Sequence, residues 1–213
     1  YEWMDEGFTS WIESECMKII SPREMSQERV GGSHSYSYYG YIKQALSGNE
    51  EAMSTHADHY TTNRAYGVAA YSKGEVLVEQ LGAIIGEKMR NEGMKEYFKV
   101  WSFKHPGPTD FKRVMERTSG IELDWYFDYF VNTTHTIDYA ISSVETNKKA
   151  STITLEKVGI MPMPQDLKVS FKDGSSSSYH IPLVIMRGNR EMNKGEILAE
   201  DWPWTNPTYT LEI

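Results

Sequence analysis

Two short runs of the chain hold side chains that could serve one reaction. The first is Trp3-Met4-Asp5-Glu6-Gly7-Phe8, where a carboxylate lies among apolar and aromatic neighbours just before an amphipathic stretch. The second is Tyr71-Ser72-Lys73-Gly74, 65 positions after Glu6. An ionised carboxylate such as that of Glu6 can bind a divalent metal ion. A phenol such as that of Tyr71 can donate a hydrogen bond to a developing oxyanion.

Each of these residues also has a simpler explanation. Glu6 fits a first-turn acid that interacts with the helix dipole, and Tyr71 fits an ordinary amphipathic tyrosine. Glu13, two turns after Glu6, could support a metal ligand or lie on a solvated face. Gly74 early in a helix costs about 1 kcal/mol relative to alanine. Its presence therefore predicts that another backbone packs closely at this point.

The histidines give a weaker signal. His56 and His59 are three positions apart and could face the same way on a helical turn, where metal binding competes with the commoner polar loop role. The others are isolated and receive no assigned role: His34, His105, His135 and His180. No H-E-x-x-H motif occurs in the 213 residues.

Composition excludes several classes of protein. The formal net charge is −8, without clustered basic residues, which argues against a nucleic-acid partner. No apolar run approaches the roughly 18 residues of a membrane span. Cys16 is the only cysteine, so an internal disulfide is excluded. Its place on an apolar stripe predicts a buried structural thiol. Asn132-Thr133-Thr134 matches a glycosylation acceptor, which matters only in a eukaryotic secretory setting.

Apolar spacing predicts helices through the first two thirds of the chain. A helix is expected over residues 6–20, with an apolar face of Phe8, Trp11, Ile12, Cys16, Ile19 and Ile20. A loop follows at 21–34, then a helix near 38–45, an irregular connector at 49–66, and helices near 69–85 and 94–101. Thr109 or Asp110 is expected to cap a further helix that Gly120 closes, and Asp124 to cap the last one.

Near residue 136 the apolar period changes from 3.6 to 2. Leu167 and Val169 alternate up to Asp173-Gly174, a strong hairpin signal, and alternation resumes from Tyr179 to Ile185. The predicted fold class is therefore α+β. Residues 1–135 are expected to form a mainly helical domain, and residues 136–213 a small antiparallel β domain.

Together the two runs resemble the gluzincin metallo-aminopeptidases, the aminopeptidase N and leukotriene hydrolase family. In that family an H-E-x-x-H helix is followed after eighteen residues by a Glu in a W-[LM]-[ND]-E-G-[FH] context. A Tyr in a Y-x-K-G context comes some sixty residues later. The stretches from Thr55-His56 to Gly74 and from Lys104-His105-Pro106 to Tyr129 are similar to the bacterial branch. Residues 136–213 resemble the β-sandwich-like domain that follows the catalytic domain in these enzymes.

This resemblance implies a role for both residues. Glu6 corresponds to the third zinc ligand, beside the two histidines of H-E-x-x-H, and Tyr71 to the residue that stabilises the tetrahedral intermediate. The substrate would be a peptide, and the zinc-activated water would be the nucleophile. The H-E-x-x-H motif and the G-x-M-E-N segment that binds the substrate amino terminus would both precede Tyr1.

The chain is therefore expected to be the C-terminal portion of a zinc aminopeptidase, inactive and zinc-free on its own. The alternative is a non-catalytic scaffold or protein-binding module that keeps the peptidase fold. An upstream segment with an intact H-E-x-x-H, eighteen residues before Glu6, would separate the two. A periplasmic or secreted location would depend on a signal upstream, so the sequence assigns no compartment.

Overall fold

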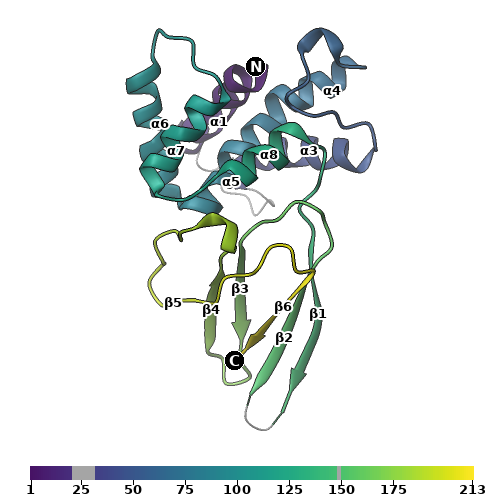
Figure 1. Ribbon diagram of the computed structural model, residues 1–213, viewed down its shortest axis with the longest axis vertical. Coiled ribbons are helices and arrows are strands. Elements are labelled where there is room, and N and C mark those ends of the chain that lie inside the picture. Colours follow the sequence, from purple (N-terminus) through teal and green to yellow (C-terminus); the bar gives the residue numbers. More distant parts are fainter. Residues whose placement is uncertain (21–31, 148–149) are drawn as a thin grey trace.

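The computed structural model describes residues 1–20, 32–147 and 150–213. Helices occupy the first part of the chain and strands the second, and Figure 1 shows them as two layers, one above the other. This arrangement confirms the α+β class. The loop predicted at 21–34 falls at 21–31 outside the described residues. None of the described helices is long and apolar enough to cross a membrane.

The helical part follows the predicted order. Its elements are α1 (Glu2–Ile20), η1 (Gly32–His34), α3 (Ser35–Leu46), η2 (Ala57–His59), α4 (Asn63–Gly67), the π-helical η3 (Val68–Lys73), α5 (Gly74–Ile85), α6 (Glu87–Trp101), α7 (Pro108–Ser119) and α8 (Asp124–Asn132). Helix α5 is the most deeply buried of the elements. Leu77, Leu81, Ile84 and Ile85 are wholly inaccessible to solvent, as their spacing predicts.

The first helix buries only the first part of the predicted face, since Phe8 and Trp11 are buried as expected. Trp3, Gly7 and Trp11 are buried, and the same face continues with Ser14 and Glu15, which contact polar groups of other helices. The apolar residues that follow Trp11 on α1 therefore point away from this buried face. Cys16 is exposed, so the prediction of a buried thiol is wrong. Ile12, Ile19 and Ile20 are exposed as well.

The predicted helix starts near residues 109 and 124 also need correction. The N-cap of α7 is Gly107, and Pro108 takes the first helical position, where a missing N–H costs nothing. The Gly107 N–H donates to Asp110 Oδ2 at 2.9 Å, so Asp110 stabilises the turn from inside the helix. Helix α8 is preceded by Leu123, and Asp124 is its first residue. Gly120 ends α7 with a left-handed φ of 72°, as expected.

The strands form two small sheets. Their bounds are β1 (Tyr139–Thr146), β2 (Ser151–Lys157), β3 (Gln165–Ser170), β4 (Ser176–Ile181), β5 (Glu196–Leu198) and β6 (Thr208–Glu212). The strand order is β1-β2-β6 in one sheet and β3-β4-β5 in the other. The predicted hairpin at Asp173-Gly174 joins β3 to β4, and Gly174 has a φ of 88°.

Two features of the strand part differ from a simple antiparallel arrangement. Strand β5 pairs in parallel with β4, so the second sheet is mixed. The return strand predicted up to Ile185 ends at Ile181. Pro182 follows, and because it has no N–H it cannot continue the ladder. A short 3-10 turn, η4 (Val184–Met186), comes next and packs below the helices, where the Glu122 N–H donates to the Met186 carbonyl at 2.9 Å.

Candidate active site: Glu6 and Tyr71

The two sequence motifs meet where α1 crosses the start of α5. Gly7 and Gly74 pack backbone against backbone: a Cβ on Gly7 would lie 2.6 Å from the Cα of Gly74, and a Cβ on Gly74 would lie 2.8 Å from the Cα of Gly7. No side chain fits in this space. The close approach predicted from Gly74 is confirmed, and its partner is the glycine of the other motif.

This crossing brings Glu6 and Tyr71 together. Glu6 precedes Gly7 on α1, and Tyr71 lies on η3, three residues before Gly74. The neighbouring Glu6 carboxylate is the main reason why the pKa of Tyr71 is raised above its ordinary value of 10. The tyrosine remains 43% exposed, so its hydroxyl is also open to solvent. The chain thus holds a carboxylate and a protonated phenol side by side on an accessible surface.

Tyr71 lies on a stretch of π-helix. Segments with this i→i+5 pattern are rare and occur often at functional sites. Thr62 begins the helical run, and its side chain accepts a hydrogen bond from the Ala65 N–H at 3.1 Å. The backbone then passes through α4, η3 and α5 with helical dihedral angles at both junctions, Gly67 and Lys73. The wider turn therefore sits inside one continuous helical segment.

Lys73 of the same motif anchors this segment from the inside. Its ammonium group donates to Glu50 Oε1 at 2.6 Å and to the Thr133 carbonyl at 3.2 Å. It also lies over the rings of Tyr41 and Phe130, at 5.4 and 5.1 Å from their centroids. The Lys73 and Glu50 side chains are only 1% and 7% exposed. Burial lowers the pKa of Lys73, and Glu50 opposes that shift.

The other residues considered from the sequence lie elsewhere. Glu13 is exposed, in keeping with a solvated face. His56 caps η2, where its Nδ1 accepts from the Asp58 N–H at 3.2 Å. His56 and His59 are both exposed, with ring centroids 5.4 Å apart. Within the described residues, the groups of three side chains that could hold a metal ion include neither of them, nor Glu6.

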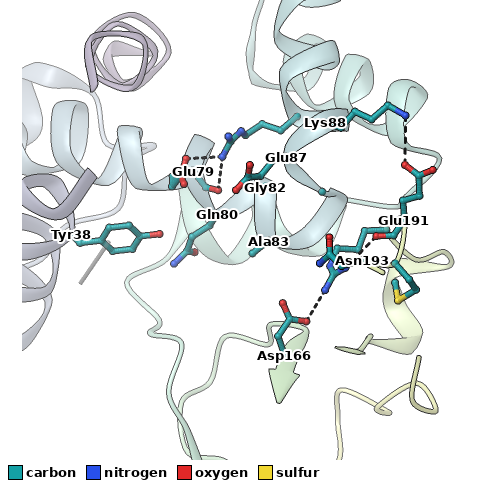
Figure 2. A pocket seen from close by; sticks show the side chains of 14 residues that line it. Tyr38, Glu79, Gln80, Gly82, Ala83, Glu87, Lys88, Asp166, Glu191 and Asn193 are labelled. Atoms are coloured by element: carbon teal, nitrogen blue, oxygen red, sulfur yellow. Dashed lines mark hydrogen bonds and ion pairs between the residues drawn. The ribbon is translucent and has the colours of Figure 1, made fainter. Parts of the chain in front are cut away.

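A cavity of about 590 Å³ lies away from Glu6 and Tyr71, between α5, α6 and the segment before β5 (Figure 2). Most of its charged side chains pair with one another. Lys88 lies 3.6 Å from Glu191, and Arg190 Nη2 donates to Asp166 Oδ1 at 2.9 Å. We interpret this cavity as a solvated joint between the helices and the strands.

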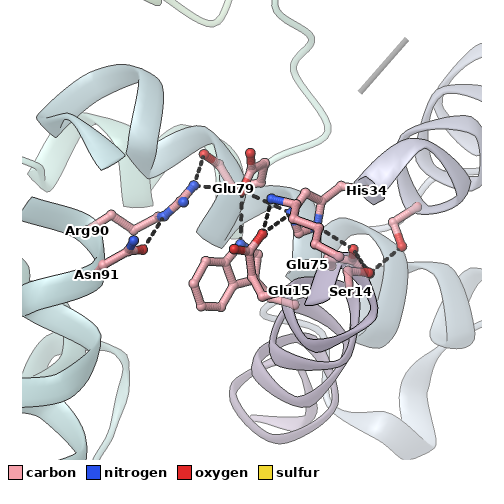
Figure 3. Close-up of polar contacts among 10 residues, drawn as sticks. Ser14, Glu15, His34, Glu75, Glu79, Arg90 and Asn91 are labelled. Atoms are coloured by element: carbon pink, nitrogen blue, oxygen red, sulfur yellow. Dashed lines mark hydrogen bonds and ion pairs between the residues drawn. The ribbon is translucent and has the colours of Figure 1, made fainter. Parts of the chain in front are cut away.

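A buried polar cluster near α1 escaped the sequence analysis. His34, left without a role there, lies between carboxylates of α1 and α5, and Figure 3 shows the group. One signal could have revealed it. Glu75 and Glu79 stand one turn apart on a helix that is otherwise rich in valine, leucine and isoleucine, and buried carboxylates need partners.

The donors around Glu6 fit part of a zinc site. Glu6 offers a partly exposed carboxylate, and Tyr71 next to it offers a phenol, which matches one metal ligand and one hydrogen-bond donor. Catalytic zinc sites use three protein ligands. Since the described residues place one candidate here, the remaining ligands would have to come from another segment.

Two known proteins are similar to this chain, one in sequence and one in fold. The chain is 23% identical over 121 residues to aminopeptidase N of Streptomyces lividans, covering 57% of this chain and 14% of that protein. The crystal structure of Legionella pneumophila aminopeptidase A in complex with aspartic acid has a similar fold, with a TM-score of 0.56 and 12% identity. That likeness covers 100% of this chain and 21% of the other. The chain thus spans a small part of both relatives.

The family model decides the assignment. The family described as "Peptidase family M1 domain" matches this chain over residues 2–130. The matched range is more than half of the chain and includes both the Glu6 and the Tyr71 motifs. The chain therefore belongs to peptidase family M1.

Proposed function

We propose that this chain is the C-terminal portion of a zinc-dependent aminopeptidase, which removes amino-terminal residues from peptides. In this proposal Glu6 is one of three zinc ligands, and an upstream segment with H-E-x-x-H supplies the other two. The observation that carries the proposal is the convergence of Glu6 and Tyr71 at the glycine crossing. Membership of the M1 family supports it.

Tyr71 would act as a hydrogen-bond donor. A phenol with a pKa of 10 or above is protonated at neutral pH, so Tyr71 can donate to a carbonyl oxygen that gains negative charge. Zinc, when bound, would supply an activated water and polarise the scissile carbonyl. The Lys73–Glu50 ion pair would keep Tyr71 in place, because it ties η3 to the segment after α3.

We also propose that the division into two domains holds, with residues 1–135 part of the catalytic domain and 136–213 a β-sandwich-like domain. Both sheets are built only from strands of the second part, which supports this division. The helical part would then carry the chemistry, and the strand part would support it from below.

The upstream sequence of the parent gene provides the first test. An H-E-x-x-H eighteen residues before Glu6 supports the enzyme, whereas a degenerate motif supports a scaffold or binding module. Metal analysis provides the second. The 213-residue chain should contain no stoichiometric zinc, and the full-length protein should contain one zinc ion that Glu6→Ala removes. Zinc retained after Glu6→Ala would contradict the assignment of Glu6 as a ligand.

A further inference from the structure

His34 is buried, and both of its ring nitrogens face carboxylates (Figure 3). Its Nδ1 lies 2.7 Å from Glu75 Oε1, and its Nε2 lies 2.9 Å from Glu15 Oε1. A carboxylate oxygen of Glu79 is 3.3 Å from the same Nε2. A neutral imidazole has only one N–H and would turn a lone pair toward one of these carboxylates. With all three carboxylates ionised, both nitrogens must donate, which makes His34 an imidazolium cation.

Each of the carboxylates is also held by other groups. Glu75 accepts from the hydroxyls of Ser14 and Ser37 at 2.7 and 2.6 Å. Glu79 accepts from Arg90 Nη1 at 2.6 Å and from the Trp11 indole at 2.9 Å.

Charge balance leads to the same conclusion. Glu15 pairs with the partly exposed Lys18. Among the described residues, Arg90 and Lys18 thus offset two of the three carboxylates, and a protonated His34 offsets the third. Arg90 and Lys18 bind the oxygens of Glu79 and Glu15 that a metal ion at Nε2 would need as ligands. A proton on Nε2 therefore fits this site better than a metal ion does.

The cluster lies beside the glycine crossing. Ser14 and Glu15 belong to α1, the helix that carries Glu6. Glu75 follows Gly74 directly, and Glu79 is one turn farther along α5. His34 reaches both helices from η1. Its ring stacks on Trp11 of α1, with planes 6° apart and centroids 6.3 Å apart. One buried cation thus joins the two helices whose contact sets the distance from Glu6 to Tyr71.

We propose that His34, as an imidazolium, is a positioning residue that fixes α1 against α5 and so holds Glu6 beside Tyr71. The link to Glu6 and Tyr71 rests on the proposed function, whereas the joining of the two helices stands on its own. Loss of the proton would leave carboxylates facing a ring lone pair in a buried space. The two helices would then be held less firmly.

The direction of the pH dependence follows from the surroundings. Burial alone would lower the pKa of His34, but Glu75, Glu79 and Glu15 outweigh it and raise the pKa above 6.5. A group whose pKa rises on folding stabilises the folded state fully below its unfolded pKa. That stabilisation is lost as the pH rises through the folded pKa. The joint between α1 and α5 should therefore weaken on the alkaline side.

Nuclear magnetic resonance of the 213-residue chain with labelled histidines tests this. His34, identified with His34→Gln, should carry protons on both nitrogens at pH 7 and titrate with a midpoint above 6.5. The amide signals of Gly7 and Gly74 should shift with the same midpoint, and this transition should vanish in His34→Gln. A His34 that is neutral at pH 7 would overturn the proposal. Gly7 and Gly74 amide signals that do not change as His34 titrates would overturn it as well.

A milder variant guards against misfolding of His34→Gln. Glu15→Gln removes one partly exposed carboxylate and should lower the midpoint of His34 while the fold persists; an unchanged midpoint would contradict the assigned contacts. Added zinc at pH 7 should leave the His34 signals unchanged, and stoichiometric displacement of the proton by zinc would overturn the role of the proton.

In the full-length protein, kcat should fall as the pH rises through the His34 midpoint, and His34→Gln should abolish that limb of the profile. An unchanged limb in the variant would refute the positioning role. If His34 proved to be an imidazolium but the full-length protein had no peptidase activity, the proposed function would be contradicted. The role of His34 in joining α1 to α5 would still stand.

Discussion

Helix α5 and strand β1 represent two extremes of burial in this molecule. Val76, Leu77 and Val78 on α5 are wholly inaccessible, and nine of the twelve residues of this helix are buried. On β1, Ile141 and Val144 are more than half exposed, at 57% and 61%. The match to the M1 family covers residues 2–130 and ends before the strands. The helical part thus has many positions where packing restricts the sequence, and the first sheet has few.

The buried ion pair of the helical part should give the largest effect. Lys73→Met leaves Glu50 buried without a partner, and removing one member of a buried pair costs about 3–5 kcal/mol. Chemical denaturation of the chain should show this loss of unfolding free energy. The double variant Lys73→Met with Glu50→Leu should recover most of it. A single variant as stable as the wild type would show that the pair is solvated.

The strand part also contains a buried ion pair, between Glu196 and Arg190. Its carboxylate accepts two hydrogen bonds from Arg190, each at 2.7 Å, and both side chains are less than a tenth exposed. Glu196→Gln should cost about 1.5–3 kcal/mol, the scale of a hydrogen bond to a charged group. Denaturation at pH 7 measures this loss. If the variant lost nothing, the strand part would lack any site comparable to Lys73.

The pH dependence of this pair has a definite sign. Arg190 is the main cause that lowers the pKa of Glu196 from 4.5 to about 2. A lowered folded pKa stabilises the protein above the unfolded value and loses that contribution as the pH falls toward 2. The difference in stability between wild type and Glu196→Gln should therefore shrink between pH 4.5 and 2.

The glycine crossing predicts a smaller but more local effect. Gly74→Ala places a Cβ against the backbone of Gly7, and such overpacking costs about 1–3 kcal/mol. Gly67→Ala is the matched control, since Gly67 has a helical φ of −61° and open space where the Cβ would lie. Thermal unfolding should show a loss for Gly74→Ala and none for Gly67→Ala. Equal thermal stability of the two variants would contradict the close contact between Gly7 and Gly74.

The smallest effect is expected on β1. Ile141→Thr keeps a β-branched side chain at an exposed position, so its stability should change by less than about 0.5 kcal/mol. The same denaturation experiment measures it. A loss of several kcal/mol would mean that Ile141 is covered in solution, and the contrast between β1 and α5 would fail.

Local patterns predicted much of the fold. The apolar period predicted the helices, and the Asp173-Gly174 pair predicted the hairpin. Gly74 early in a helix predicted a close backbone contact. The second half of the face that α1 buries was not predicted, because polar contacts of Ser14 and Glu15 continue it beyond Trp11. Parallel pairing of β5 was missed because β5 has only three residues, too few for a period.

For the candidate site, the sequence predicted the residues but not what holds them. Glu6 and Tyr71 were selected by the motifs around them, and their assigned roles remain proposals. The clusters that position them depend on long-range contacts. His34 reaches Glu75 across 41 positions, and Lys73 reaches Thr133 across 60. Such contacts leave no periodic trace in a single sequence.

The most direct test of the central claim is a comparison of Glu6→Ala and Tyr71→Phe in the full-length protein. Steady-state kinetics and zinc content should be measured on the same samples. Tyr71→Phe keeps the ring and should lower kcat by about 100-fold or more, the scale for loss of one oxyanion donor, with zinc content and KM little changed. Glu6→Ala should lose the zinc itself. A zinc-loaded Tyr71→Phe protein with near-normal kcat would make Tyr71 a packing residue and contradict the shared site.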